Sequence, residues 1–468
     1  MIGQPKSLKR AVELFRDPAT AEKRRILAAR WAELDPALRL SGQGLGQKAT
    51  GCGATIGIQP RCDFACTGCY LGREANDAPA MSTAAVLRQL DELRRWLGPK
   101  SNVQVTDGEV TLRPVEELTE IFRYARSIGI IPMMMTHGDN LRRRPGLLER
   151  LMTEGGLTEV SIHVDITQRG RDGYKAPKSE LELMPLRDEF AAMVRQARKS
   201  TGKPLRAAMT LTVTQDNLPQ IADVVRWLVR NRDAFSLVSF QPLAQVGRTR
   251  KSQRGVTATD LWREVGRATA EFGLPLDGTG PMHLGHTECT RFVPLVALAR
   301  PGEEPRLFQG IRDTPEDVAV MEEFFAKGLG GVAFRDDHSL EKVARFLGMV
   351  RTAPGWMLGR ARRWVDGRSR NEAGIPLSRL LLDSLRGRLR LDGLTLTSHH
   401  FMSPQELQTP VGRDRLTACV FRLPYKGEMV PMCQMNADGV RERFYAEILE
   451  GEAMEGSETA RSLLPVTY

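Results

Sequence analysis

Apolar residues between positions 52 and 250 alternate between two spacings. Short apolar runs predict strands at Ala54–Gln59, Val103–Thr106, Ile130–Met135, Glu159–Asp165, Leu205–Thr214 and Phe235–Gln241. Apolar residues three and four positions apart predict helices at Thr83–Leu97, Val115–Ile128, Pro145–Thr153, Leu186–Lys199 and Leu218–Asn231. This alternation is typical of parallel strands joined by crossover helices, so we expect an α/β fold. Six such units form a partial (β/α)6 barrel, in which functional residues gather at the C-terminal ends of the strands.

The segments on either side of this barrel have different patterns. Residues 1–50 contain two amphipathic stretches, Leu8–Phe15 and Ala21–Leu34, followed by a glycine-rich linker at 41–46. Residues 251–468 begin with an amphipathic helix at Thr257–Phe272 and then mix helical and strand-like runs. We therefore expect an N-terminal helical segment at 1–50, the barrel at 51–250, and a mixed α+β accessory region at 251–468.

Composition narrows the class of protein. The chain has 468 residues, of which 41% are hydrophobic and 26% charged, as is typical of a globular protein. Seven cysteines in so long a chain do not form a disulfide framework, and they predict a reducing, cytoplasmic location. The sequence contains no run of about 18 apolar residues, so no membrane span is predicted. The net charge of +10 favours anionic partners, although a solvated basic surface explains it equally well.

The stretch Arg360–Arg390 is rich in arginine, with leucines at helical spacing. A basic amphipathic helix of this kind can lie on an anionic membrane surface, so peripheral membrane contact is one expectation. A solvated helix packed on the core is the other. Binding of nucleic acid is not expected, because no aromatic stacking platform or clustered basic motif is present.

Three thiols follow the first predicted strand. Cys62, Cys66 and Cys69 have the spacing C-x3-C-x2-C, and thiolates are ligands of iron–sulfur clusters. A [4Fe–4S] cluster held by three cysteines leaves one iron open to bind another molecule. The alternative is a structural zinc site, which needs four nitrogen or sulfur ligands and commonly shows paired C-x2-C units. The chain has no second pair of that kind.

The segment from Cys62 to Tyr70 resembles the cluster loop of the radical S-adenosylmethionine (SAM) enzymes. The resemblance implies that the open iron binds the amino and carboxylate groups of SAM. One electron, from a reductant such as flavodoxin or ferredoxin, then cleaves SAM to methionine and a 5′-deoxyadenosyl radical. In that family an aromatic residue often precedes the last cysteine. Here Gly68 occupies this place and the aromatic residue is Tyr70.

Further resemblances assign SAM contacts. Asp107-Gly108-Glu109 resembles the Gly-Gly-Glu-Pro turn after the second strand, which binds the SAM amino group, with Asp107 in place of the first glycine. His137 takes the place of asparagine in a Thr-Asn-Gly turn after the third strand. The resemblance implies further contacts with the ribose and carboxylate of SAM by polar residues of strand four, and with its adenine at the end of strand six: Ser161, His163, Asp165 and Gln241.

The tail contains a second informative stretch. Two short strands joined at Lys426-Gly427 would bring Cys419 and Cys433 together. This stretch resembles the C-terminal part of the tetraether-lipid-synthase-like radical SAM enzymes and the auxiliary-cluster domains of peptide-modifying members, although its spacing matches neither fully. The cysteines outside the first loop could hold an auxiliary iron–sulfur cluster or be buried small apolar residues: Cys52, Cys289, Cys419 and Cys433.

These features predict a radical SAM enzyme that removes hydrogen from an unactivated C–H bond. The tail and the basic helix favour a lipid or another long apolar substrate. The main alternative is the maturation of a peptide or a peptide-derived natural product. An alternative from another class is a non-enzymatic iron–sulfur or zinc protein that binds nucleic acid through its positive charge.

Overall fold

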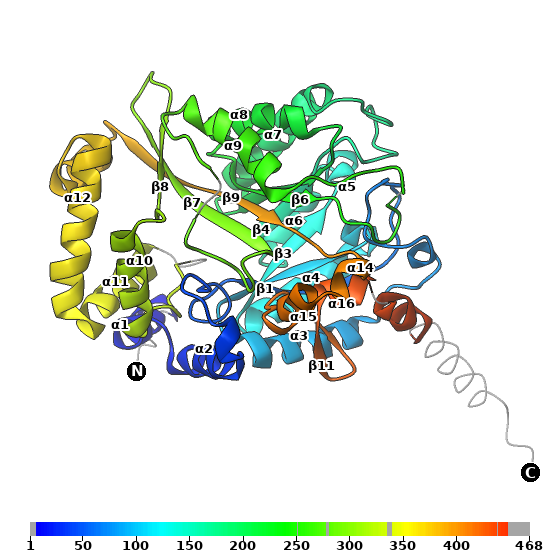
Figure 1. Ribbon diagram of the computed structural model, residues 1–468, viewed down its shortest axis with the longest axis horizontal. Helices are drawn as coiled ribbons and strands as arrows, with labels where there is room; N and C mark the ends of the chain where they lie inside the picture. Colours follow the sequence, from blue (N-terminus) through cyan, green and yellow to red (C-terminus); the bar gives the residue numbers. More distant parts are fainter. Residues whose placement is uncertain (1–5, 250, 278–279, 335–338, 438, 448–468) are drawn as a thin grey trace, which may run out of the picture.

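A single, mostly parallel sheet forms the centre of the protein. In the computed structural model, which describes residues 6–249, 251–277, 280–334, 339–437 and 439–447, the sheet has eleven strands in the order β11-β10-β1-β2-β3-β4-β5-β6-β9-β7-β8. The strands β1 to β6 are consecutive and parallel. Figure 1 shows helices above and below the strands of the sheet in that view.

The six expected βα units are confirmed. Their strands are β1 (Cys52–Gln59), β2 (Ser101–Asp107), β3 (Ile130–Thr136), β4 (Glu159–His163), β5 (Arg206–Val213) and β6 (Phe235–Pro242). The helices that follow are α3 (Thr83–Leu97), α4 (Val115–Ser127), α5 (Asp139–Arg143), α6 (Leu147–Thr153), α7 (Met184–Thr201) and α8 (Ile221–Arg230). The expected helix at Pro145–Thr153 is therefore preceded by a short additional one, α5. The partial barrel predicted from the sequence is thus present.

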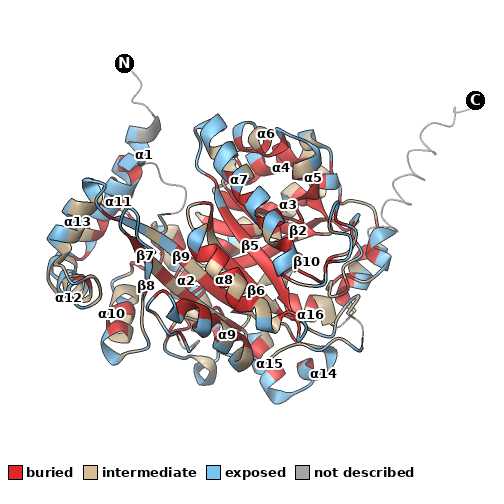
Figure 2. Cartoon of the chain, turned by 90° about the horizontal axis from the view of Figure 1, so that it is seen from above, coloured by how far each residue is buried: buried red, intermediate tan, exposed pale blue. Residues whose placement is uncertain are grey.

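The two faces of the barrel sheet differ in chemistry. On β1, for example, Ile56 and Ile58 belong to the large apolar core, whereas Thr55 lines an internal cavity. The same alternation places Val103 and Val105 of β2 in that core. Strand side chains alternate between the faces with a period of two, so one face packs on helices and the other encloses a lined space. Figure 2 shows the resulting band of buried strands inside the helices.

Strands from the C-terminal region extend the same sheet at both edges. On one side β9 (Arg390–His399) pairs in parallel with β6, followed by antiparallel β7 (Thr290–Ala299) and β8 (Arg306–Gln309). On the other side the expected hairpin is present as β10 (Arg422–Tyr425) and β11 (Glu428–Pro431), and β10 pairs in parallel with β1. The sheet therefore continues across the expected boundary near residue 250, and the division into domains stays a prediction.

The remaining helices surround this sheet. Near the N-terminus α1 (Lys6–Arg16) packs against α11 (Ser339–Thr352), and α2 (Ala21–Glu33) packs against α3. The others are α9 (Ala258–Ala270), α10 (Pro315–Ala326), α12 (Arg362–Ala373), α13 (Leu377–Leu385), α14 (Pro404–Leu407), α15 (Pro410–Thr417) and α16 (Met432–Ala437), and residues 440–447 are also helical. Within the described ranges, no helix is long and apolar enough to cross a membrane.

Candidate SAM and iron–sulfur site

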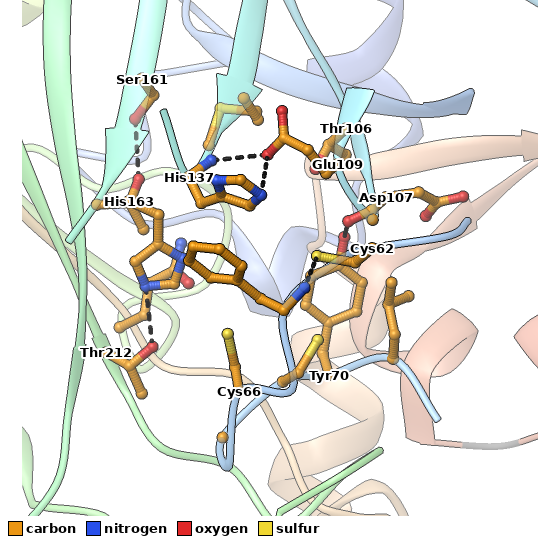
Figure 3. Close-up of a pocket in the computed structure, with 18 of the residues that line it drawn as sticks. Cys62, Cys66, Tyr70, Thr106, Asp107, Glu109, His137, Ser161, His163 and Thr212 are labelled. Atoms are coloured by element: carbon orange, nitrogen blue, oxygen red, sulfur yellow. Dashed lines mark hydrogen bonds and ion pairs between the residues drawn. The ribbon is translucent and has the colours of Figure 1, made fainter. Parts of the chain in front are cut away.

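A cavity of about 150 Å³ lies at the C-terminal ends of the barrel strands. All three cysteines of the first loop, which we call the cluster-loop cysteines (Cys62, Cys66 and Cys69), line it. Figure 3 shows Cys62, Cys66 and Tyr70 on one side of this space, facing polar groups from the ends of the strands. The predicted SAM contacts that also line the cavity are Tyr70, Asp107, Gly108, Glu109, His137, Ser161, His163 and Gln241.

The cysteine loop is held in place by its own non-cysteine residues. The ring of Phe64 stacks on the imidazole of His137, with the centroids 3.7 Å apart and the planes 3° from parallel. The backbone N–H of Asp139 donates to Nδ1 of His137, so the ring proton is on Nε2, which donates to Asp63 across 2.7 Å. Arg248 donates to the carbonyl oxygens of Phe64 and Gly72 from the other side. These contacts orient the loop before any ligand binds.

His137 therefore fixes the cysteine loop in addition to lining the cavity. Burial by itself would raise the pKa of Asp63, but the hydrogen bonds from His137 and Arg143 lower that pKa to about 2. Asp63 is consequently an ionised acceptor at neutral pH. The expectation that His137 contacts SAM stays a prediction, because its ring nitrogens already have protein partners.

The three thiols line one cavity and could bind the same metal cluster. Burial raises the pKa of Cys62 to about 12 and also raises the pKa of Cys66 and of Cys69, so each thiol is protonated at neutral pH unless a cation binds. None of the three is in a disulfide. A [4Fe–4S] cluster supplies the missing positive charge, and its three thiolates would come from these cysteines.

A mononuclear metal site at the same place fits less well. Cys62, Asp63 and His137 place one ligand atom each within 4.8 Å of one another. However, Asp63 and His137 already satisfy each other by a direct hydrogen bond, and Cys66 and Cys69 lie outside this group. In a cubane cluster each thiolate binds a different iron, so its ligand atoms stand further apart than around a single ion. Within the described residues, the Sγ atoms of Cys62, Cys66 and Cys69 do not all lie within 4.8 Å of one another, so they are spaced more widely than the ligand atoms of that group.

The turn after β2 has an unusual backbone. Asp107 has a φ of 104°, in the region that favours glycine, and glycine is the residue that the resembled motif has there. A Cβ added at Gly57 would lie 2.1 Å from the Asp107 carboxylate, so only glycine leaves room for that side chain. Arg441 forms an ion pair with the carboxylate, and both side chains are buried. The negative charge expected to face the SAM ammonium is therefore already balanced by Arg441.

The next two residues of the turn also bind protein groups. A Cβ at Gly108 would lie 2.2 Å from the carbonyl oxygen of Arg61, so Gly108 permits close contact with the start of the cysteine loop. Glu109 is fully buried and accepts hydrogen bonds from Thr136 Oγ1 (2.6 Å) and the backbone N–H of His137 (2.8 Å). Its carboxylate thus ties the ends of β2 and β3 together.

Polar groups from β4 form a network with β5. Ser161 and Thr210 are joined by a 2.9 Å hydrogen bond between their hydroxyls. His163 Nε2 lies 2.5 Å from the carboxylate of Asp165. We expected Asp165 on the strand itself, but β4 ends at His163, and Asp165 turns back from the following segment. Burial would raise the pKa of Asp165, but His163, Thr167 and the backbone N–H of Thr212 lower it to about 2.

Several groups remain available to a ligand in this cavity. Thr55 lines it with a fully buried hydroxyl that has no hydrogen-bond partner among the described residues. Gln241 lines it at the end of β6. The phenol of Tyr70 donates to the carbonyl oxygen of Asp107 across 3.3 Å. A partly polar cavity with an orphaned hydroxyl beside three thiols is consistent with SAM at an iron–sulfur cluster.

The described side chains of the other cysteines lie away from this cavity. Cys289, Cys419 and Cys433 gather beside α15 and α16 and do not line the cavity. Cys52 begins β1, and its side chain lies outside the described part of the chain. The neighbouring histidines of the segment 283–289 do not converge with Cys289, because His283 contacts the carbonyl oxygen of Thr290 and His286 accepts from the backbone N–H of Glu288.

Sequence reasoning missed three residues that hold the site together: Phe64, Arg248 and Arg441. Phe64 lies inside the motif, but nothing in the sequence indicates that its ring stacks on His137. Arg441 is 334 positions from Asp107, so no local pattern connects them. A carboxylate at a turn position that favours glycine was the one available signal that Asp107 needs a buried partner.

Comparisons with known proteins agree with this geometry. Residues 56–228 match the model of the radical SAM superfamily. No curated protein matches. Among solved structures, anSMEcpe with bound AdoMet aligns at 11% identity over 47% of this chain and 59% of its own, with a TM-score of 0.35. The FeFe-hydrogenase maturase HydG from Carboxydothermus hydrogenoformans aligns at 12% identity over 77% and 90%, with a TM-score of 0.33.

The alignment spans 59% of anSMEcpe, less than two thirds of its length, and both TM-scores are below 0.5. The family assignment depends on the matched segment. That segment begins within β1, includes the cluster-loop cysteines and the turns after β2, β3 and β4, and ends within α8. It implies a [4Fe–4S] cluster and SAM as cofactors, as expected from the motif. Residues 56–228 of this chain thus match the radical SAM superfamily.

Proposed function

We propose that this chain is a radical SAM enzyme that acts on a lipid or another long apolar molecule. Together, a bound [4Fe–4S] cluster and SAM supply a 5′-deoxyadenosyl radical that removes a hydrogen atom from an unactivated C–H bond. Residues of this chain would hold the cluster through the cluster-loop cysteines and orient the loop through Phe64 and His137. Polar side chains of β1, β4 and β6 that line the cavity would bind SAM: Thr55, Ser161 and Gln241.

The observation that carries the proposed substrate is a second cavity inside the barrel. It has a volume of about 330 Å³ and shares lining residues with the first, including Gln241, His399 and Phe421. Its other lining residues include Met133, Leu237 and Phe292, between threonine and serine side chains of the same strands. An apolar chain extending from the SAM site into this space would be shielded from water, which protects a radical from side reactions.

An exposed basic and apolar surface offers a source for such a substrate. The α12–α13 surface consists of these two helices and the preceding helical segment Trp356–Ala361. No residue of α13 is buried, and Leu358, Leu381 and Leu385 are 61%, 52% and 87% exposed. Arg362 and Arg386 form no ion pair within the described residues. Figures 1 and 2 place α12 at the periphery of the molecule. Exposed leucines beside arginines suit an anionic lipid surface.

The decisive experiment follows deuterium. The reconstituted enzyme, SAM and a reductant are incubated with deuterated lipids or with deuterated peptides, and 5′-deoxyadenosine is analysed by mass spectrometry. Deuterium transfer from lipid is expected. Transfer from peptides alone would reverse the substrate assignment in favour of peptide maturation.

A variant can test the inner cavity separately. Ala208 lines that cavity but not the first one, so Ala208→Phe should fill it and abolish deuterium transfer while SAM cleavage without substrate continues. Ala208→Ser, which adds a single atom, is the matched control. Normal deuterium transfer in Ala208→Phe would show that the substrate lies elsewhere.

The α12–α13 surface is tested with vesicles. Leu381→Ser/Leu385→Ser should reduce co-flotation with vesicles that contain phosphatidylglycerol, whereas Leu181→Ser, at a 55% exposed leucine outside this surface, should not. Equal vesicle binding by the wild type, the double variant and Leu181→Ser would exclude the α12–α13 surface as the membrane contact.

A further inference from the structure

The inner cavity is polar where it meets the SAM cavity. Strands β5, β6 and β9 are neighbours in the sheet, and their register aligns polar side chains in two rows across it. The lower row consists of Thr210, Ser239 and Thr397, and the upper row of Thr212, Gln241 and His399. The lower row lines the inner cavity and the upper row lines the SAM cavity. Two rows of one strand face are about 7 Å apart, so both lie close to the SAM site.

The polarity falls with distance from SAM. The next row of the same three strands consists of Ala208, Leu237 and Thr395, so two of its three side chains are apolar. All three line the inner cavity and none lines the SAM cavity. A substrate in this space would therefore meet polar groups at its SAM end and a more apolar wall behind it.

Most members of the two polar rows already have a role. The three threonines each have a protein partner within 2.9 to 3.3 Å: Ser161, the carbonyl oxygen of Arg291, and His163. Gln241 is expected to contact the adenine of SAM. The two members that remain are Ser239 and His399, one in each row.

Both remaining side chains lack a partner for one polar atom. The hydroxyl of Ser239, a residue that is 8% exposed, forms no hydrogen bond within the described residues. His399 contacts Thr290 Oγ1 through Nδ1 across 3.1 Å, which leaves Nε2 without a partner in the described part of the chain. Its ring lies beside that of Phe421, with the centroids 6.2 Å apart. Polar atoms enclosed in this way normally have a partner, so the two atoms suit a polar ligand group.

The chemistry of the pair selects an uncharged ligand group. Burial lowers the pKa of His399 to about 4, so its imidazole is neutral at pH 7. A hydroxyl can both donate and accept, and Nε2 of a neutral imidazole does one or the other. Neither row contains a cation that would balance a carboxylate or phosphate in an enclosed site. A hydroxyl, carbonyl or ether oxygen has the hydrogen-bonding capacity that fits.

We propose that Ser239 and His399 bind an uncharged oxygen group of the substrate and thereby present a C–H bond close to that oxygen to SAM. The apolar remainder of the substrate would extend past Ala208 and Leu237. This inference rests on the proposed function, because it takes the inner cavity as the place of the substrate. Both residues lie outside the matched segment 56–228, so that match does not describe the proposed contacts.

Binding without a reductant tests the oxygen group, because no turnover occurs. In equilibrium dialysis with the anaerobic holoenzyme, radiolabelled dodecanol should bind more tightly than dodecane. Ser239→Ala should weaken dodecanol binding roughly two- to tenfold, as expected for one hydrogen bond, and leave dodecane binding unchanged. The matched control is Ser236→Ala, which removes a hydroxyl of the same cavity near the start of β6 and should bind dodecanol like the wild type.

His399 is tested by a pair of variants in the same assay. His399→Phe keeps a ring beside Phe421 but has no Nε2, so it should weaken dodecanol binding roughly two- to tenfold. His399→Gln keeps a polar nitrogen and should retain most of the affinity. Equal binding of alcohol and alkane by the wild type, or equal affinities in these two variants, would overturn the proposal. Equal losses in Ser239→Ala and Ser236→Ala would do so as well.

Turnover tests the position of attack. Dodecanol is supplied with deuterium either on the two carbons nearest the hydroxyl or on the terminal methyl group, and 5′-deoxyadenosine is analysed by mass spectrometry. Deuterium is expected from the first label. Deuterium from the methyl label alone, or from neither alcohol while lipids still react, would overturn this inference and leave the proposed function intact. Absence of transfer from every lipid would instead refute the proposed function.

Discussion

The ion pair between Asp107 and Arg441 should control both stability and SAM binding. Arg441 comes from the helical residues 440–447, and its guanidinium also lies over the ring of Tyr70, with its carbon 5.1 Å from the centroid. Exposure of the paired side chains is 2% for Asp107 and 4% for Arg441. Because water cannot replace a lost partner at that depth, Arg441→Met should lower the free energy of unfolding by about 3–5 kcal/mol.

A double-mutant cycle gives the coupling between the two residues. Asp107→Gly also leaves one charge unpaired, but it relieves a backbone conformation that costs about 1–3 kcal/mol for a residue other than glycine. The double variant Asp107→Gly/Arg441→Met leaves neither charge buried alone. It should therefore be more stable than the sum of the single losses predicts, by up to about 3 kcal/mol.

The assays are urea unfolding and anaerobic SAM binding by equilibrium dialysis. Lys426→Met is the matched control, because Lys426 forms an exposed ion pair with Glu447 in the same C-terminal segment. Lys426→Met should change the free energy of unfolding by no more than about 1 kcal/mol, and it should leave SAM affinity unchanged. Arg441→Met should weaken SAM binding several-fold, since the Asp107 turn lines the cavity. A cost below about 1 kcal/mol, with no coupling in the cycle, would refute the reasoning.

Two further changes test other buried contacts. His137→Phe keeps a ring against Phe64 but loses the hydrogen bond to Asp63, which is worth about 1.5–3 kcal/mol. A chelator should therefore remove iron from the reconstituted variant roughly tenfold faster, or more, than from the wild type. An unchanged rate of iron loss would contradict the orienting role of His137. At α10, burial would raise the pKa of Asp317, but Arg312, Trp364 and Arg368 lower it to about 2. Because this folded-state pKa lies below the ordinary 3.8, the stabilisation is complete above about pH 4 and is lost as the pH falls through 2. Asp317→Asn should lower the free energy of unfolding by about 3–5 kcal/mol at pH 7 and remove the loss of stability that the Asp317 carboxylate causes at low pH. Identical acid unfolding curves for the variant and the wild type would exclude this role of Asp317.

The barrel could be predicted because its signals are local. Each strand and helix can be recognised within about ten residues from the spacing of its apolar positions. The C-terminal hairpin is a similar case. Lys426 and Gly427 adopt φ values of 51° and 78°, the left-handed pair that a two-residue hairpin turn requires. The glycine at the second position made this turn recognisable from the sequence alone.

The electrostatics of the site could not be predicted in the same way. The resemblance assigned Asp107, Glu109 and His137 to the SAM site, and all three line the cavity. It did not reveal that each side chain also has a protein partner: Arg441 for Asp107, Thr136 for Glu109 and Asp63 for His137. A motif specifies the backbone positions around a cofactor. The hydrogen-bond partner of each side chain depends on segments that are distant in sequence and that no local pattern reveals.

The C-terminal segment 419–447 is therefore part of the radical SAM site, although it lies outside the matched domain. Its strand β10 covers β1, which would otherwise be an exposed edge of the barrel sheet directly before the cysteine loop. Its residue Arg441 balances the charge of the SAM turn, and Phe421 and Met432 complete the cavity wall. The accessory region thus supplies structure that the barrel cannot provide for itself.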